Sequence, residues 1–339
     1  MEISYKTKLL TASDEDIAQA VEIISRGGIV GMPTETVYGL AADAEDPEAV
    51  AKIFEAKGRP QDNPLIVHLA DISQIEEFAR DIPDIACKLA ERFCPGPLTM
   101  VLPKRERIPH ITSAGLDTVG IRIPCHKAAL KLIRASGKAI AAPSANLSGS
   151  PSPTTAEHVM NDMKGRIPAV IDGGSCAVGV ESTVIAFEGG KIRLLRPGFI
   201  SMEELAEFGE VIMDRHITEA AAEGEAVRSP GMKYKHYSPE ANVTILSGSR
   251  EKYLEFVNGI DSEGAFAMPF DEDEGKCGIP CIPYGNTSEE QAERIFSVLR
   301  RFDEIGAKQV YARCPEKDGV GLAVYNRLLR AAGFEIIDL

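Results

Sequence analysis

The chain has 339 residues, which is long for a single hydrophobic core, so two domains are predicted. Apolar residues make up 44% of the sequence, which is ordinary for a globular protein and too high for a disordered one. The formal net charge of -14 argues against a protein that coats nucleic acid through a broad basic surface, but it leaves room for a local anion site. No apolar run is long enough to cross a bilayer, and the N-terminus lacks a signal-peptide pattern, so we expect a cytoplasmic protein without membrane contact.

Residues 1–225 alternate between short apolar runs and helical patterns, which predicts an α/β domain with one large twisted sheet. The predicted strands span 29–32, 65–69, 99–102, 119–123, 139–142, 169–171, 182–187 and 192–195. The predicted helices span 14–26, 47–56, 82–92, 127–135, 155–163 and 202–208.

Residues 241–339 show a more regular alternation, which predicts a small Rossmann-like parallel α/β domain. Its predicted strands span 243–246, 265–268, 309–312 and 334–337, and its predicted helices span 250–258, 288–305 and 320–332. The region contains neither a G-x-G-x-x-G sequence nor a Walker loop. Residues 226–240 are predicted to link the two domains.

Metal binding by cysteines is not expected. The seven cysteines are scattered and include no C-x-x-C pair, so the sequence predicts neither a structural zinc site nor any other set of metal ligands.

Polar side chains gather where the predicted strands of the first domain begin or end. PTETVYGLAAD (33–43) places Thr36 directly after a strand, the usual position of a ligand site in an open α/β sheet, although a capping turn explains the threonine equally well. In KGRPQDNPLIVHL (57–69), Lys57 and Arg59 leave the end of a helix, a pair suited to polyphosphate but also to the helix dipole. His68 of the same segment, inside an apolar strand, is by itself most often a core histidine.

Arg122 alternates with two isoleucines in VGIRIP (119–124), so it is predicted to point away from them. If its face of the sheet is covered, Arg122 needs an anionic partner, either a substrate carboxylate or a structural acid. APSANLSGSPSPTT (142–155) supplies short hydroxyl and amide side chains that suit a phosphate cradle, or simply a connecting loop. Ser182 and Arg196 stand at strand edges in ESTV and LRPG.

Taken together, these segments indicate a ligand site more strongly than any one of them does alone. In this order, PTETVYGL, KGRPQDNPL, GPLT, VGIRIP, APSAN-SG, ESTV and LRPG resemble the YrdC-type threonylcarbamoyl-AMP synthases over roughly residues 10–210. The segment SPGMKYKHYSP (229–239) and the α/β region behind it resemble the long, two-domain form of that family.

The resemblance implies a twisted mixed sheet around a concave cavity, and an enzyme of the nucleotidyltransferase class. Such enzymes combine L-threonine, bicarbonate or CO2, and ATP into L-threonylcarbamoyl-AMP and pyrophosphate. The product is handed to a transferase that modifies the adenosine beside the anticodon of tRNA. Magnesium is expected with ATP, but no carboxylate cluster marks a dedicated protein site.

The family pattern also implies site residues in this chain. Lys57 and Arg59 are expected to neutralise the triphosphate in the transition state, and Arg122 is expected to hold the threonine carboxylate. The residues expected around ATP are Lys57, Arg59, Asn63, Thr118, Ser144, Asn146, Ser152, Arg196 and Tyr237. The residues expected around threonine are Thr36, His68, Arg122, Ala142 and Ser182.

In the two-domain form the linker lies over the mouth of the cavity, which predicts a lid with Tyr237, or alternatively Tyr234, contacting ATP. The alternative for the linker is a basic tether that touches nothing. His68 is either a general base or a residue that orients threonine.

Two other functions remain open at this stage. One is a non-catalytic RNA-binding module, which the charge of -14 and the lack of a basic stripe disfavour. The other is a carbamoyltransferase of hydrogenase maturation, whose paired C-x-x-C segments this chain lacks. Direct tRNA binding and the role of the C-terminal domain are not settled by the sequence.

Overall fold

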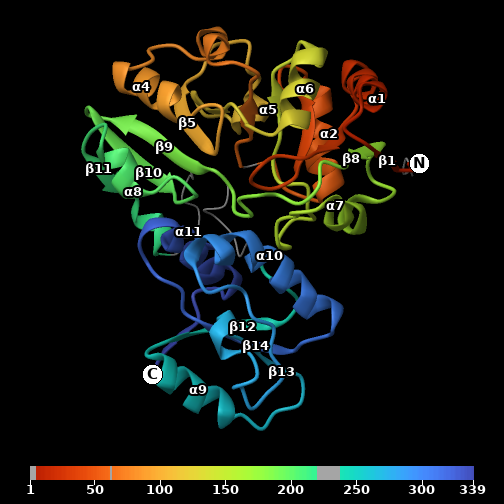
Figure 1. Cartoon of the computed structure of the whole chain (residues 1–339). Helices are drawn as coiled ribbons and strands as arrows, with labels where there is room; N and C mark the ends of the chain where they lie inside the picture. The colour runs from red at the N-terminus through yellow and green to blue at the C-terminus, as the bar shows by residue number, and fades with distance from the viewer. Residues whose placement is uncertain (1–4, 62, 220–236) are drawn as a thin grey trace.

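The computed structural model describes residues 5–61, 63–219 and 237–339 and arranges their strands in two sheets (Figure 1). Within these residues, eleven strands form a mixed sheet in the order β1-β8-β2-β3-β7-β4-β6-β5-β9-β10-β11. Four further strands form a parallel sheet in the order β13-β14-β12-β15. The expected fold class, a large mixed sheet followed by a small parallel α/β domain, is therefore confirmed.

The elements of the larger domain follow the predicted order. Its strands are β1 (Lys8–Leu10), β2 (Val30–Met32), β3 (Gly39–Asp43), β4 (Ile66–His68), β5 (Leu98–Pro103), β6 (Thr118–Arg122), β7 (Ile140–Ala141), β8 (Ala169–Ile171), β9 (Thr183–Glu188), β10 (Lys191–Arg196) and β11 (Val211–Met213). Its helices are α1 (Asp14–Ser25), α2 (Pro47–Lys57), α3 (Ile75–Phe78), α4 (Asp84–Phe93), α5 (His110–Ser113), α6 (Lys127–Ser136), α7 (Ala156–Met163) and α8 (Met202–Ala206).

Strands β1, β3 and β11 were not predicted from the sequence. β3 is the important one, because the sequence predicted no strand in PTETVYGLAAD, whereas β3 pairs antiparallel with β2 and is buried along its whole length. Glycine and alanine have low intrinsic preference for strands, so GLAAD carries no strand signal of its own. Pairing with β2 and β7 inside the core decides its conformation instead.

Helix α2 shows how local sequence positions the cations that follow it. The Asp46 side chain accepts hydrogen bonds from backbone N–H groups of the first turn, and Pro47 occupies the first turn. Gly58 ends the helix in the left-handed region at φ 60°, a conformation that glycine adopts without strain. This C-cap turns the chain so that Lys57 and Arg59 both reach the same cavity, described below.

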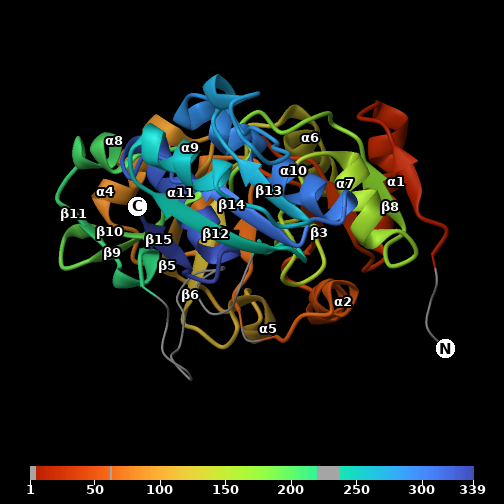
Figure 2. The same cartoon turned by 90° about the horizontal axis from the view of Figure 1, so that it is seen from below.

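The smaller domain packs helices on both faces of its sheet. It contains β12 (Asn242–Ser247), α9 (Arg250–Asn258), β13 (Ala265–Met268), α10 (Ser288–Glu304), β14 (Gln309–Arg313), α11 (Gly319–Ala331) and β15 (Ile336–Asp338). Helices α10 and α11 lie on the side of this sheet that is turned toward the larger domain, and α9 lies on the opposite side (Figures 1 and 2). Arg300 of α10 and Arg327 of α11 form ion pairs with the larger domain.

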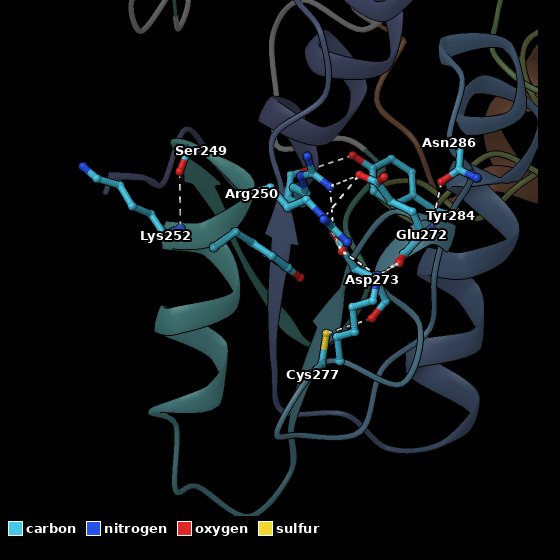
Figure 3. Close-up of polar contacts among 12 residues, drawn as sticks. Ser249, Arg250, Lys252, Glu272, Asp273, Cys277, Tyr284 and Asn286 are labelled. Carbon is cyan, nitrogen blue, oxygen red and sulfur yellow. Dashed lines mark hydrogen bonds and ion pairs between the residues drawn. The ribbon is translucent and has the colours of Figure 1, made fainter.

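The carboxyl edge of the small sheet is held by an ion-pair cluster (Figure 3). The fully buried carboxylate of Asp273 accepts from Arg250 Nε at 2.6 Å and from Arg313 Nη1 at 2.7 Å. Arg250 is the first residue of α9 and Arg313 is the last residue of β14. The Asp273 carboxylate therefore holds the start of α9 against the end of β14. Each arginine has this acid as a partner, which indicates a structural role for the cluster.

The part of the chain that the structure describes contains no helix that is long and apolar enough to cross a membrane.

Candidate active site

A cavity of about 780 Å³, with the open space at its mouth included, lies over the central strands of the larger sheet. Among the described residues, its lining includes four basic side chains and one acidic side chain. The described lining residues are Thr34, Thr36, Val37, Gly39, Lys57, Arg59, Leu65, Ile66, His68, Arg122, Ala142, Pro143, Ser144, Asn146, Ser148, Gly149, Ser150, Glu181, Ser182, Arg196 and Tyr237.

Neighbouring strands β4 and β6 place His68 and Arg122 side by side. The two strands are parallel, and these residues occupy the same register position, so both side chains leave the same face of the sheet. Ile121, one residue earlier, points to the opposite face and is fully buried in the core. The alternation in VGIRIP thus sends the arginine toward the cavity.

The buried guanidinium of Arg122 forms an ion pair with Glu35. Arg122 Nη2 lies 2.6 Å from Glu35 Oε1, and the two side chains are 5% and 7% exposed. Arg122 Nη1 donates to Thr36 Oγ1 at 2.9 Å, and its Nε donates to the Gly96 carbonyl at 3.4 Å. Glu35 is thus a structural acid of the kind that the sequence named as one partner for Arg122.

The pair fixes the charge state of Glu35. Burial acts to raise the pKa of this carboxyl, but the charge and hydrogen bond of Arg122 outweigh it, so the pKa lies below its ordinary value. The second carboxylate oxygen accepts from the Cys125 backbone N–H at 3.2 Å. Glu35 is therefore an ionised, fully engaged residue that holds the arginine in place.

The imidazole of His68 is neutral at physiological pH. Burial, followed by the nearby charge of Arg122, lowers the pKa of His68 to about 3. Nδ1 lies 3.2 Å from the Ile66 carbonyl, which assigns the proton to Nδ1 and leaves Nε2 as an acceptor.

This lowered pKa predicts a loss of stability in acid. The unfolded state takes up a proton on His68 near pH 6.5, whereas the folded state resists protonation down to about pH 3. The stability from neutral His68 is thus complete above pH 6.5 and falls as the pH drops toward 3, by about 1.4 kcal/mol per pH unit. Urea unfolding between pH 7 and pH 5 measures this slope.

His68→Gln removes the ionisable group, so it is expected to flatten the acid slope, while the exposed His110→Gln serves as the matched control. An unchanged slope in His68→Gln would contradict the assignment of a buried, neutral imidazole.

Lys57 anchors the loop that follows β7. Its ammonium donates to the backbone carbonyls of Ser144 and Asn146, the latter at 2.7 Å, and lies 3.4 Å from Asn146 Oδ1. The loop also bonds to the Lys57 backbone, because the Ser148 backbone N–H donates to the Lys57 carbonyl at 3.0 Å. Burial, and next the charge of Arg59, lower the pKa of Lys57 well below its ordinary value. Lys57 thus shapes the cavity wall as well as lining it.

A second cluster of hydrogen-bonded polar side chains, Arg196, Ser182 and Thr99, lies where β9 begins and β10 ends. Arg196 donates from Nη2 to Ser182 Oγ at 3.1 Å and from Nε to the Ser182 carbonyl at 3.2 Å. Ser182 Oγ also lies 2.8 Å from Thr99 Oγ1 of β5. Because these groups are buried and bonded to one another, their geometry is fixed before any ligand arrives.

Tyr237 is the described end of the linker and lines the cavity. Its ring is buried and packs against Phe296 of α10 at a centroid distance of 5.2 Å. The next residue, Ser238, donates its backbone N–H to the Gly149 carbonyl in the loop after β7. The other basic and aromatic residues of SPGMKYKHYSP, including Tyr234, lie outside the described residues.

Two family models match the chain. The Sua5–YciO–YrdC family, described as telomere recombination, matches residues 22–198. The C-terminal domain of threonylcarbamoyl-AMP synthase matches residues 200–333. The chain belongs to the Sua5/YrdC family, in its two-domain form.

Similar proteins span the whole chain. Threonylcarbamoyl-AMP synthase of Pyrococcus abyssi is 45% identical over 330 residues, which cover 94% of this chain and 95% of that protein. The Bacillus subtilis protein of the same name is 44% identical over 339 residues, which cover 98% of this chain and 97% of that protein. The crystal structure of P. abyssi Sua5 complexed with L-threonine has a TM-score of 0.91 at 43% identity and covers 98% of this chain and 100% of that one. These names agree with the expectation of an enzyme of the nucleotidyltransferase class.

Three residues that the family resemblance suggested do not line the cavity. Ser152 is fully buried and donates its hydroxyl to Glu181 Oε1 at 2.6 Å. Thr118 lines a separate, small pocket, which shares Leu65 and Ile66 with the main one. Asn63 is buried, and its amide makes no hydrogen bond with the rest of the described chain.

The eleven other predicted residues lie together around the cavity: Thr36, Lys57, Arg59, His68, Arg122, Ala142, Ser144, Asn146, Ser182, Arg196 and Tyr237. Which of them binds ATP and which binds threonine stays a prediction.

Two acids of this Sua5/YrdC chain were not predicted as site residues. Glu35 sits between two threonines in PTETV, directly after a predicted strand end where a ligand site was expected, but the sequence indicated no role of its own for it. Glu181 lines the cavity and precedes Ser182, but its partner comes from the other domain, so no local pattern could identify it.

The described residues contain no group of three or more His, Cys, Asp or Glu side chains arranged to hold a metal ion. Glu181 is the one acid among the described lining residues, and its oxygens already accept from Ser152 and Arg327. The protein groups described here therefore do not fit a dedicated magnesium site, and any Mg²⁺ would depend on ligands from phosphate.

Proposed function

We propose that this chain is an L-threonylcarbamoyl-AMP synthase. The observation that carries the proposal is the cavity itself, which gathers Lys57, Arg59, Arg122 and Arg196 in an acidic protein. Clustered cations in a partly enclosed space suit a polyanion such as a nucleoside triphosphate. A relative of this chain, P. abyssi Sua5, has the same fold and was crystallised with L-threonine, which supports the second substrate.

The ATP end of the cavity is assigned to the loop after β7 and the cations around it. Ser144, Ser148 and Ser150 line this wall with hydroxyl groups that suit phosphate oxygens, while the Asn146 amide donates to the Leu147 and Ser150 carbonyls and holds the loop in shape. Arg59 and Arg196 supply charge that neutralises the triphosphate, and Tyr237 stands at the same wall for the ribose or base. Because Lys57 is bonded to the loop carbonyls, its main task is to fix the loop in this shape.

The threonine end is assigned to Arg122 and the hydroxyl groups beside it. Arginine has more N–H donors than Glu35, Thr36 and the Gly96 carbonyl use here, so Arg122 retains capacity for the substrate carboxylate. The neutral His68 beside it orients the amine through Nε2 rather than carrying charge. The pKa of about 3 makes this imidazole a weak general base, so we assign it the orienting role.

The reaction balances without a covalent enzyme intermediate. The threonine amine attacks bicarbonate, a C–N bond forms, and water leaves to give a carbamate. A carbamate oxygen then attacks the α-phosphorus, the bond to the β-phosphate oxygen breaks, and pyrophosphate leaves. The site's role is to hold both substrates in line, to stabilise phosphate charge and to keep water from the unstable carbamate.

Magnesium, when bound with ATP, would draw charge from the phosphates, and we assign its ligands to ATP rather than to the described protein groups. We further propose that the product feeds a cytoplasmic tRNA threonylcarbamoyl transferase.

The test is pyrophosphate release by the purified protein, with L-threonine and bicarbonate each omitted in turn. We expect release that requires both substrates and that falls at least ~100-fold in Arg59→Ala, because one phosphate-neutralising charge is lost from a preorganised site. Arg80→Ala removes an exposed arginine that pairs with Asp81 and does not line the cavity, so it serves as the control. Release that requires neither substrate, or tRNA binding without any release, would contradict the proposal.

A further inference from the structure

A buried arginine of the smaller domain reaches the wall of the cavity in the larger domain. Arg327 lies in α11, its side chain is 0% exposed, and its Nε lies 2.7 Å from Glu181 Oε2. A second guanidinium nitrogen, Nη2, donates to the Glu181 backbone carbonyl at 3.4 Å, and Nη1 donates to Asn326 Oδ1 at 2.9 Å. One cation of the C-terminal domain thus neutralises the one acid among the described lining residues.

The charge of Glu181 matters because of what surrounds it. Burial acts to raise the pKa of Glu181, but the charges of Arg327 and Arg196 outweigh it, so the carboxyl stays ionised. A buried carboxylate at the wall would repel a triphosphate and would draw Arg196 away from it. By pairing with Glu181, Arg327 cancels the charge that would cause both effects. Ser152 donates its hydroxyl to the other oxygen of Glu181 at 2.6 Å.

The same arginine supports the described end of the linker. Its guanidinium carbon lies 5.7 Å from the centre of the Tyr237 ring, within range of a cation–π contact. Ser238, the next residue, donates its hydroxyl to the Ala331 carbonyl at the end of α11 and its backbone N–H to Gly149 in the cavity loop. Helix α11 therefore contacts the cavity wall at both Glu181 and Tyr237.

We propose that Arg327 is a positioning residue for the triphosphate nucleotide: it neutralises Glu181 and supports Tyr237, so the ATP end of the cavity is complete only when the C-terminal domain is docked. The inference rests on the proposed synthase function. It assigns the C-terminal domain a defined role in nucleotide binding, one that the sequence did not reveal.

The test compares Arg327→Met, Glu181→Gln and the double variant in the full chain. Arg327→Met exposes the nucleotide to an unpaired carboxylate, so the KM for ATP is expected to rise at least ~10-fold, while the KM for L-threonine changes less. Glu181→Gln in the same chain removes that charge, so the double variant is expected to recover most of the ATP affinity. The double variant replaces a buried ion pair by neutral groups, a change that proteins commonly tolerate, so the test stands even if Arg327→Met does not fold.

The matched control is Arg313→Met. Arg313 of β14 also pairs with a buried carboxylate, that of Asp273 at 2.7 Å, but the pair lies within the smaller domain and neither residue lines the cavity. This variant is expected to lower stability without a selective rise in the KM for ATP. Equal rises in Arg313→Met and Arg327→Met, or no recovery in the double variant, would overturn the proposal.

Binding of a non-hydrolysable ATP analogue, measured by calorimetry, distinguishes failure of the synthase function from failure of the role proposed for Arg327. If the wild-type protein binds the analogue but makes no threonylcarbamoyl-AMP, the synthase proposal fails while the Arg327 inference is still tested by affinity. If the wild-type protein makes the product and Arg327→Met binds the analogue normally, the inference alone fails.

Discussion

Arg122→Met is expected to abolish measurable synthesis and to destabilise the protein. The substitution removes the cation assigned to the threonine carboxylate and leaves Glu35 buried without its partner. Breaking a buried ion pair on one side costs about 3–5 kcal/mol, so the midpoint of urea unfolding should fall together with the activity. We expect kcat/KM for L-threonine to drop by at least ~1000-fold, a loss of about 4 kcal/mol in transition-state stabilisation.

The double variant Glu35→Gln/Arg122→Met separates the two effects. It replaces the ion pair by neutral side chains of similar size, so most of the stability should return while the activity does not. A stable double variant with normal kinetics would show that Arg122 only balances Glu35 and does not bind substrate.

Lys57→Met is the second large effect that we expect. The ammonium is the donor for the carbonyl groups of Ser144 and Asn146, and burial prevents water from replacing it. Each carbonyl left without a donor costs about 1–3 kcal/mol, and the loop that presents phosphate-binding groups loses its anchor. The KM for ATP should rise and kcat should fall, with a combined loss in kcat/KM of ~100-fold or more.

Lys52→Met on the same helix is the matched control, because Lys52 also donates to a backbone carbonyl, that of Gly27 at 2.6 Å, but does not line the cavity. Lys57→Arg tests the geometry, since a planar guanidinium does not fit the site of a compact ammonium. Normal kinetics in Lys57→Met, together with unchanged unfolding, would contradict the anchoring role.

The sequence predicted most of the strands and helices because their signals are local. Helix α2 carries its own N-cap and C-cap residues, Asp46 and Gly58, and the strand around Arg122 carries an alternating pattern. Strand β3 escaped prediction because GLAAD has no intrinsic strand preference and is held by its neighbours.

The site was partly predictable because some of its residues also carry local signals. Lys57, Arg59 and Arg122 stood out as cations in apolar or rigid surroundings, and the structure brings them to one cavity. Their counter-charges were not predictable from spacing, because Glu35 lies 87 positions from Arg122 and Glu181 lies 146 positions from Arg327. Pairings of this kind depend on the tertiary fold.

The division between an enzyme and a non-catalytic binding module is best decided by the product itself. Purified protein would be incubated with ATP, magnesium, L-threonine and carbon-13 bicarbonate, and the nucleotide products would be analysed by mass spectrometry. We expect a threonylcarbamoyl-AMP species whose mass carries the carbon-13 label and which is absent without threonine. AMP or ADP alone, with no labelled adduct under any combination of substrates, would contradict the proposed synthase activity.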